Sequence, residues 1–234
     1  MPTNSLGQPI GFPVPGWTAR PRPPLTPMTG RTCRSEPLDP ARHGADLWQA
    51  VSLDPDGRNW TYLPYGPFAA ERDYRAWLES VAGKEDPQFH TVIEQATGRA
   101  VGVASYLRID PPVGVIEVGH IHYSPALQRT PLATEVMYLM MARVFDELGY
   151  RRYEWKCDAL NAPSRRAAER FGFQYEGLFR QATLYKGRNR DTAWYGMTDK
   201  DWPAVKAGYL AWLDPANFDG EGRQKRGLAE LRGA

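Results

Sequence analysis

The sequence predicts an α/β domain built on a mixed sheet. Helix-like and strand-like periodicities alternate along the chain, three strand-like segments follow one another between turn signals, and a long apolar helix-like segment comes directly after them. The chain has 234 residues, of which 42% are hydrophobic, so it is long enough to form one substantial domain with extensions.

The first 29 residues contain eight prolines, each of which fixes φ and removes a backbone donor. We therefore expect residues 1–29 to form a partly ordered arm on the domain surface, whose deletion leaves a folded domain; a proline-rich recognition site is the alternative. Amphipathic helices are predicted at 41–51 and 69–81. A meander of three strands is predicted next, at 89–94, 100–109 and 113–123.

A buried helix is predicted at 132–148, where the residues are apolar over most of the circumference and Gly149 supplies the stop. The later elements are predicted as a strand at 153–157, a helix at 163–171, strands at 173–177 and 192–197, and a helix at 202–213. The expected organisation is an arm at 1–29, a main domain at 30–200, a C-terminal helix within 201–218 and a flexible tail at 219–234.

Composition excludes several classes of protein. Lys plus Arg is 29 against 27 for Asp plus Glu, a balance that disfavours nucleic acid as a partner. Neither Cys33 nor Cys157 belongs to a C-x-x-C pair, so no disulfide framework or thiolate zinc site is expected. Without a signal-like N-terminus or a long apolar span, we expect a cytoplasmic protein with no membrane partner.

Three local features carry chemistry. The first is the segment Gln128 to Glu135, a tight turn into a helix in which Thr130 could be the N-cap and Pro131 lies in the first turn. Exposed N–H groups at the start of a helix can bind phosphate. Most helices that begin with Thr-Pro, however, bind no ligand. Asn161 and Ser164 open the second feature, which the simplest interpretation reads as a helix N-cap and a first-turn residue.

The third feature is Glu117, in the middle of an apolar strand. Strand alternation predicts Glu117 on one face with Gly119, Ile121 and Tyr123, and the opposite face is formed by Ile116, Val118, His120 and His122. Because unpaired burial of a carboxylate is costly, Glu117 is either paired or functional.

From about residue 31 to residue 198, the order of these parts resembles the GNAT acyltransferases, and within them most closely the Rim-type ribosomal-protein N-acetyltransferase branch. The resemblance implies the GNAT fold, with a mostly antiparallel sheet flanked by helices. The family's phosphate turn, Gln/Arg-x-x-Gly-x-Gly/Ala, stands here as Gln128-x-x-Pro131-x-Ala133, and Pro131 removes one amide donor. The resemblance implies acetyl-CoA as co-substrate, with its phosphates bound by this turn through Gln128, Arg129, Thr130, Leu132, Ala133 and Thr134.

The resemblance also implies roles for single residues. Glu117 would act as the general base, directly or through water, and Ser164 would protonate the leaving thiolate. Asn161 would hold the pantetheine arm or order water, and a strand amide near Ile121 would meet the oxyanion. These roles suit the chemistry, because an amine attacks a thioester only when neutral and a carboxylate in apolar surroundings can take its proton.

Other residues have two interpretations each. His120 and His122 share a strand face as metal ligands could, but with four histidines and no third ligand nearby we expect no metal. Arg165 and Arg166 either reach the 3′-phosphate of CoA or form a solvated helix face. Four aromatic residues either line an acceptor pocket or only pack: Trp60, Tyr62, Tyr65 and Phe68.

The leading hypothesis is an enzyme that transfers acetyl from acetyl-CoA to a primary amine by direct attack in a ternary complex. The acceptor would be a protein N-terminus or a small molecule, and a homodimer is possible. The alternatives are a transferase that uses succinyl-CoA or another acyl donor, and a catalytically silent module that binds CoA or another protein.

Overall fold

One eight-stranded sheet forms the centre of the computed structural model, which describes residues 1–233. Its order is β1-β2-β3-β4-β5-β6-β8-β7, in which β5 and β6 are parallel and all other neighbours are antiparallel. The strands are β1 (Met28–Thr29), β2 (Cys33–Pro37), β3 (Gln88–Glu94), β4 (Ala100–Asp110), β5 (Val115–Tyr123), β6 (Arg152–Asp158), β7 (Gln174–Tyr185) and β8 (Arg188–Thr198). This arrangement confirms the predicted α/β class and the mostly antiparallel sheet.

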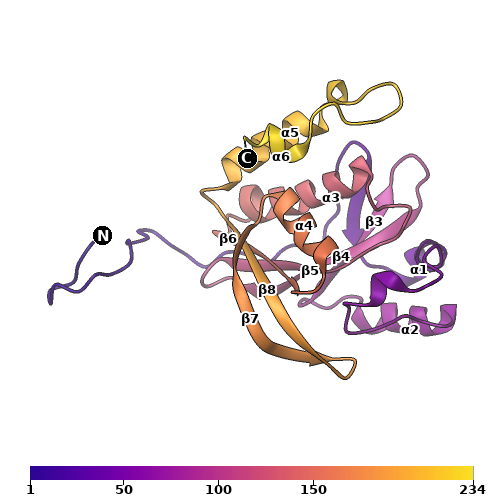
Figure 1. Cartoon of the computed structure of the whole chain (residues 1–234), viewed down its shortest axis with the longest axis horizontal. Coiled ribbons are helices and arrows are strands. Elements are labelled where there is room, and N and C mark those ends of the chain that lie inside the picture. The colour runs from indigo at the N-terminus through magenta and orange to yellow at the C-terminus, as the bar shows by residue number, and fades with distance from the viewer. Residues whose placement is uncertain (234) are drawn as a thin grey trace.

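Helices cover both faces of the sheet, with α1 and α2 on one side and α3, α4 and α5 on the other (Figure 1). The α-helices are α1 (Pro40–Val51), α2 (Glu71–Val81), α3 (Pro131–Ala142), α4 (Ala162–Phe171), α5 (Trp202–Leu213) and α6 (Leu228–Leu231). Shorter turns are η1 (Arg58–Trp60), the π-helical η2 (Arg143–Glu147) and η3 (Pro215–Asn217). No helix in the described part of the chain is both long and apolar enough to span a membrane.

The sequence explains why α3 is apolar around most of its circumference. Met137, Met140 and Met141 are fully buried between the sheet and the neighbouring helices, and α5 packs against α3 from the side away from the sheet. On the opposite face, Tyr74 and Leu78 of α2 form a separate core. The five helices predicted from periodicity are all present, with starts and ends within a few residues of those expected; the last turns of the predicted helix 132–148 are the π-helical η2.

The two closing strands are much longer than predicted. The segments expected at 173–177 and 192–197 belong to one hairpin, β7–β8, joined at Lys186 and Gly187. Both turn residues have positive φ, 49° and 70°, as a two-residue type I′ turn requires. The outer half of β7 is largely solvent-exposed. Its sequence therefore lacks the alternation of apolar and polar residues from which a half-buried strand is predicted.

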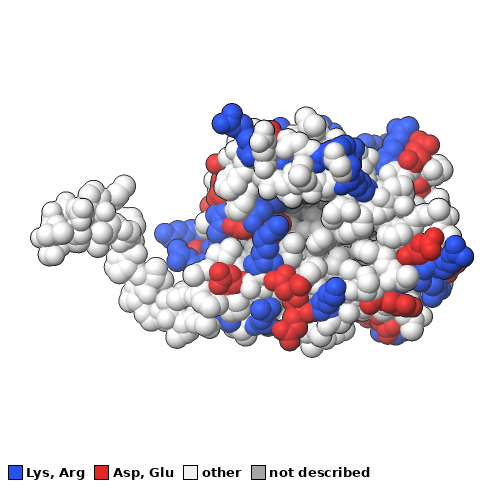
Figure 2. Space-filling view, turned by 90° about the horizontal axis from the view of Figure 1, so that it is seen from below, with Lys and Arg blue, Asp and Glu red and all other residues white. Residues whose placement is uncertain are grey.

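The proline-rich segment has two parts that differ in packing. Residues 1–16 project from the body and carry no charged side chain (Figures 1 and 2). Residues 17–29 lie on the body: Trp17 Nε1 donates to the carbonyl of Pro112 at 2.7 Å, and Met28 in β1 is buried in the α3 core. This second part is packed more closely than the partly ordered surface arm that proline content suggested, because proline permits edge pairing and close packing.

The C-terminal segment also differs from the expected tail. Residues 228–231 form α6, which packs against α5 and buries Leu228. Gly and charged residues dominate the sequence here, so composition predicted fraying, whereas Leu228 and Leu231 pack on the core and Arg232 Nη2 donates to the Glu169 carbonyl at 3.1 Å.

Candidate active site

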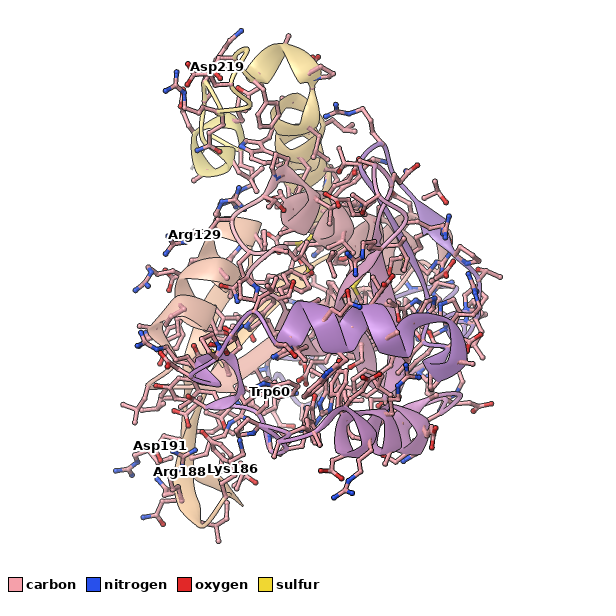
Figure 3. All side chains as sticks on the ribbon, turned by 90° about the vertical axis from the view of Figure 1, so that its right-hand side faces the viewer. Trp60, Arg129, Lys186, Arg188, Asp191 and Asp219 are labelled. Atoms are coloured by element: carbon pink, nitrogen blue, oxygen red, sulfur yellow. The ribbon has the colours of Figure 1, made fainter. Side chains whose placement is uncertain are left out.

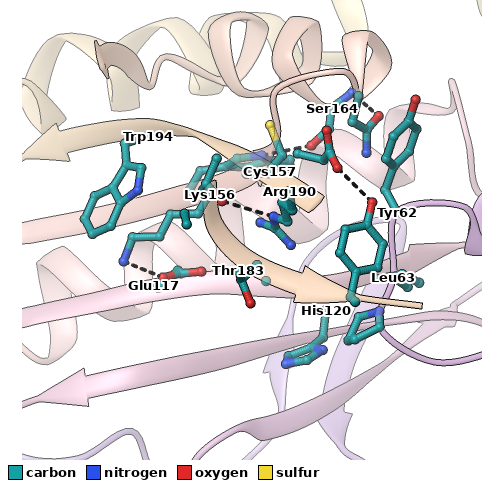
Figure 4. A pocket seen from close by; sticks show the side chains of 18 of the residues that line it. Tyr62, Leu63, Glu117, His120, Lys156, Cys157, Ser164, Thr183, Arg190 and Trp194 are labelled. Carbon is teal, nitrogen blue, oxygen red and sulfur yellow. Dashed lines mark hydrogen bonds and ion pairs between the residues drawn. The ribbon is translucent and has the colours of Figure 1, made fainter. Parts of the chain in front are cut away.

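A cleft opens where two parallel strands stop pairing. β5 and β6 pair over four positions, from Val115 with Arg152 to Val118 with Trp155, and they do not pair beyond that point. The cleft that begins there has a volume of about 660 Å³ and extends to the β7–β8 hairpin (Figure 4). Such a gap at the carboxyl ends of strands is where α/β sheets bind ligands.

A β-bulge shapes this end of β5. Ser105 pairs with Gly119 and Val103 pairs with His122, so β5 holds one more residue than β4 across this interval. His120 takes up the extra length with φ of 49°, a left-handed conformation that is uncommon for a residue other than glycine.

The bulge reverses the side-chain alternation that the sequence predicted. Ile121 and Tyr123 pack towards the α3 core, whereas His120 and His122 contact aromatic residues on the α1–α2 side. Glu117 therefore shares its face with the two histidines, and the predicted faces are wrong beyond the bulge. One inserted residue flips every later side chain.

Glu117 is buried, with 3% of its surface exposed, and it is paired. Both of its oxygens accept from Arg108 Nη1 at 2.8 Å, and Lys156 Nζ lies 2.8 Å from Oε2. Burial raises the pKa of the Glu117 carboxyl above its ordinary value, while Lys156 and Arg108 oppose that rise. The ion pairs favour the ionised form, and burial makes that form a stronger base.

Sequence reasoning missed the two cations around Glu117. Arg108 lies on β4 and Lys156 on β6, the two neighbours of β5, so their proximity depends on the strand order. Lys156 Nζ also lies 2.7 Å from Glu154 and 3.8 Å from the centre of the Trp194 ring. Lys156 is thereby held in a well-defined place in the cleft wall.

Asn161 and Ser164 lie at the start of α4 and line the same cleft as Glu117. Asn161 Oδ1 accepts from the Ser164 amide at 3.1 Å, which is the predicted N-cap. Ser164 Oγ accepts from Trp155 Nε1 at 3.0 Å, so the indole fixes the position of the hydroxyl in the cleft wall.

The predicted phosphate turn lies at the start of α3, outside the lining of this cleft. Arg129 has φ of 61°, and Thr130 caps the helix by accepting from the Ala133 amide at 3.2 Å. That bond engages one amide expected to bind phosphate, so the expected phosphate contacts would fall more on the amides of Arg129, Thr130 and Leu132.

Several side chains of this turn contact the protein, whereas that of Arg129 is exposed at the surface (Figure 3). Gln128 Nε2 donates to the Tyr123 carbonyl at 2.8 Å, and Thr134 Oγ1 accepts from Arg170 Nη1 at 3.0 Å. Leu132 is buried in the core between α3 and β2. These contacts leave the backbone and the exposed Arg129 side chain as the parts of the turn that can meet a ligand.

The aromatic segment mainly packs. Trp60 is buried and stacks on His122 with ring centres 3.7 Å apart, and Phe68 lies against Trp60 in the same core. Tyr62 is the member of the four that lines the cleft, where its hydroxyl donates to the Leu160 carbonyl at 3.2 Å.

The histidines also have structural partners. His120 Nδ1 lies 3.0 Å from the Tyr65 hydroxyl, and burial, with Arg108 and Arg190, lowers the pKa of His120 to about 4. Burial likewise lowers the pKa of His122 to about 4. Among residues 1–233, no group of three His, Cys, Asp or Glu side chains could hold a metal ion.

The two arginines of α4 differ. Arg165 Nε donates to the Tyr195 hydroxyl at 3.1 Å, which ties this side chain to the fold. Arg166 is exposed and remains the better candidate for contact with the 3′-phosphate.

The β7–β8 hairpin supplies much of the cleft wall, and sequence reasoning missed it. Its lining residues are Phe179, Arg180, Ala182, Thr183, Leu184, Tyr185, Arg190, Thr192 and Trp194. The tip is tied to the loop after η1, because Lys186 Nζ donates to the Trp60 carbonyl at 2.7 Å and Arg188 Nη2 to the Thr61 carbonyl at 2.8 Å (Figure 3). The Lys186-Gly187 pair was the one turn signal that could have revealed the hairpin.

Known proteins share this architecture. The model of the acetyltransferase (GNAT) domain family matches residues 37–174, more than half of the chain. A GCN5-related N-acetyltransferase from Brucella melitensis is 48% identical, with 94% of this chain and 100% of that chain covered and a TM-score of 0.92. A probable GNAT-family acetyltransferase from Chromobacterium violaceum is 41% identical over 83% of this chain and 97% of its own, with a TM-score of 0.77.

A curated relative matches more distantly. The SPbeta prophage-derived uncharacterized N-acetyltransferase YokL of Bacillus subtilis is 26% identical over 127 residues, which is 54% of this chain and 70% of the relative. The family match covers the meander, the splayed strands and α4, which form the part of the cleft outside the β7–β8 hairpin. The chain therefore belongs to the GNAT family and is an N-acetyltransferase.

Proposed function

We propose that this chain transfers an acetyl group from acetyl-CoA to a primary amine by direct attack within a ternary complex. The observation that carries the proposal is the cleft at the end of the β5–β6 pairing, in which the buried carboxylate of Glu117 and the hydroxyl of Ser164 line one space. These are the two proton-transfer groups that acetylation of an ammonium needs, one at each end of the reaction.

The residues of the chain suit acetyl-CoA. Backbone amides at the start of α3 would hold the phosphates, with Gln128 keeping the turn in shape through its bond to Tyr123. Asn161 would hold the pantetheine arm. Bound acetyl-CoA supplies the electrophilic thioester carbonyl, and the backbone near Ile121, where the β4–β5 register skips two residues, would donate to its oxygen.

Proton transfers in this proposal balance within the site. Glu117 takes a proton from the acceptor ammonium, directly or through water, and the neutral nitrogen forms the N–C bond as the C–S bond breaks. Ser164 Oγ gives its proton to the departing sulfur and takes, through water, the second proton that the nitrogen loses as the amide forms. Arg108 and Lys156 keep Glu117 ionised until it accepts its proton.

The Rim-type branch is part of this proposal, on the strength of the Glu-x-Gly strand and the Asn-x-x-Ser helix start. The acetyltransferase from Salmonella typhimurium that modifies the N-terminal serine of ribosomal protein L7/L12 shares the fold at 19% identity and a TM-score of 0.62, a likeness that concerns the fold alone. The hairpin tip tied to the η1 loop favours a small acceptor over an extended peptide, because it bridges one end of the cleft.

The experiment is a thiol-release assay with acetyl-CoA and a broad panel of amines, with acetylated product identified by mass spectrometry. We expect amine-dependent release of CoA and product carrying one acetyl group. The same assay with succinyl-CoA as donor tests whether the enzyme uses a larger acyl group in place of acetyl. No amine-dependent release with either donor would leave the silent CoA-binding module as the better account.

A further inference from the structure

The charges of the cleft wall are unbalanced towards positive. Its ionisable lining side chains, apart from tyrosine, cysteine and the neutral His120, are Arg108, Lys156, Arg180, Arg190, Glu117 and Asp158. Four cations therefore face two carboxylates. An acceptor ammonium is itself a cation at neutral pH, so this wall does not suit a simple amine.

Both carboxylates are already satisfied by the protein. Glu117 accepts from two cations, as described above. Asp158 is buried, and its two oxygens accept from the Tyr185 hydroxyl at 2.8 Å and from the Leu160 amide at 2.8 Å. Neither acid is free to bind the extra positive charges of a polyamine.

Arg190 is different, because its guanidinium is largely unused. Its Nε donates to Thr192 Oγ1 at 3.1 Å, while neither terminal nitrogen reaches an acceptor among residues 1–233. The side chain is half-buried, and Figure 4 shows it in the middle of the cleft lining. Arg180, on the same hairpin, is exposed at the rim.

The field of Arg190 reaches the interior of the cleft. Arg190 and Arg108 both contribute, after burial, to the lowered pKa of His120, and Arg190 also acts on Cys157 deeper in the wall. A guanidinium with two free terminal nitrogens on one edge matches the two oxygens of a carboxylate.

We propose, building on the acetyl transfer proposed above, that the acceptor is an amino acid or a close derivative, a small molecule with a primary amine and a carboxylate that Arg190 binds. The carboxylate offsets the positive charge of the cleft and turns the amine towards Glu117. The rings of Tyr62, Phe179 and Trp194 line the same cleft and suit an apolar or aromatic side chain on this acceptor.

The test compares matched acceptors on the intact protein with acetyl-CoA. Each L-amino acid is assayed beside its amide and its decarboxylated amine, with spermidine as the polycation. We expect the amino acid with the best rate to exceed its amide and its amine by roughly 10- to 100-fold in kcat/KM, the range of a charge-assisted pair. Aminoalkylphosphonates of the same length test whether phosphonate replaces carboxylate.

Variants of Arg190 then test whether this residue binds the carboxylate. Arg190→Gln should remove most of the preference for the amino acid over its amide, while the rate with the amide changes by less than about threefold. Arg190→Lys keeps the charge but loses the fork, so it should restore only part of the preference. Arg72→Gln, whose side chain is 88% exposed on α2, is the matched control and should leave the preference intact.

A binding readout complements activity. The preferred amino acid should raise the melting temperature of the wild-type protein in the presence of CoA and raise it less in Arg190→Gln. Efficient acetylation of amides, amines or spermidine without a carboxylate preference would overturn this inference yet leave acetyl transfer standing. Preference for the phosphonates would overturn the carboxylate assignment, and absence of transfer to any amine would overturn the proposed function itself.

Discussion

Glu117 and Ser164 should differ in their pH signatures, because the proposed mechanism gives them different protons. Glu117→Gln cannot accept a proton, so its rate should fall by roughly 10²- to 10⁴-fold near neutral pH and recover partly as pH approaches the pKa of the amine, about 10 for a lysine-like acceptor. Ser164→Ala should slow turnover without that alkaline recovery. Profiles of kcat/KM from about pH 6 to 10 measure both.

The direction in which wild-type activity changes with pH can also be predicted. Because burial raises the pKa of Glu117, the activity that depends on its ionised form should fall, as pH decreases, at a pH above the ordinary glutamate value of about 4.3. CoA affinity should stay unchanged in both variants. Wild-type rates in Glu117→Gln across the whole range would exclude Glu117 as the base and direct attention to His120, which lines the same cleft.

A second buried glutamate serves stability. Glu135 on α3 accepts from the amides of Arg31, Thr32 and Cys33 at 2.7, 2.6 and 3.1 Å, and from the Thr32 hydroxyl at 2.5 Å. Burial alone would raise the pKa of Glu135, but these hydrogen bonds outweigh it and hold the pKa below its ordinary value. The stabilisation is complete above the unfolded pKa and is lost as pH falls through the folded pKa.

Glu135→Gln should therefore lower the free energy of unfolding by about 1.5 to 3 kcal/mol at neutral pH. The difference from wild type should shrink as pH falls below the ordinary glutamate pKa of about 4.3 and on through the lower pKa of the folded state. Denaturant unfolding at pH 7, 5 and 3.5 measures it. Glu79→Gln, an exposed glutamate on α2, is the control, and an equal effect of both changes at every pH would contradict the role of Glu135.

At the scale of elements, two truncations separate the parts of the N-terminal segment. Arg143 in η2 is buried, with Nη1 2.7 Å from the Thr26 carbonyl and Nη2 3.1 Å from the Pro27 carbonyl. Deleting residues 1–29 removes both carbonyl acceptors, although Arg143 keeps its ion pair with Glu147, and it removes the buried Met28. Stability should therefore fall by about 2 to 5 kcal/mol, the cost of losing a buried methionine side chain.

Deleting residues 1–16 should change stability little, since Asn4 and its neighbours hydrogen-bond only within this projecting part and to Trp17. Thermal unfolding of the two truncated proteins beside the full chain measures the contrast. Equal melting temperatures for the two deletions would show that residues 17–29 do not stabilise the body, and instability of the shorter deletion would give the projecting part a structural role.

At the scale of the whole molecule, ligand binding and folding are linked. The cleft and the α3 turn, where we propose that acetyl-CoA binds, do not exist in the unfolded chain, so acetyl-CoA at 100 times its Kd should add about 2.7 kcal/mol of stability. For a chain of this length that corresponds to a rise of roughly 5 to 10 °C in melting temperature. Absence of a shift with acetyl-CoA, succinyl-CoA and free CoA at saturating concentrations would contradict CoA binding.

The sequence by itself was enough to predict the helices and strands that have a clear local pattern of apolar residues and stop signals. Helices α1, α2, α4 and α5 show their apolar spacing and stops directly, and the meander is punctuated by turn residues. Order and type of elements were enough to recognise the family. Glu117 could be singled out as paired or functional because an apolar strand around a carboxylate is itself a local signal.

Only the tertiary structure decided the residue contacts, strand register and side-chain faces that depend on neighbours far away in the sequence. The partners of Glu117 come from the adjacent strands, and the bulge at His120 depends on pairing with β4, so alternation could not predict the face of Ile121. The largely exposed β7 and the exposed start of β8 have no clear burial pattern, which hid Arg190 on β8 and the rest of the cleft wall. Local periodicity reports which face of an element is buried, whereas strand order, register and pairing arise only when the whole chain packs.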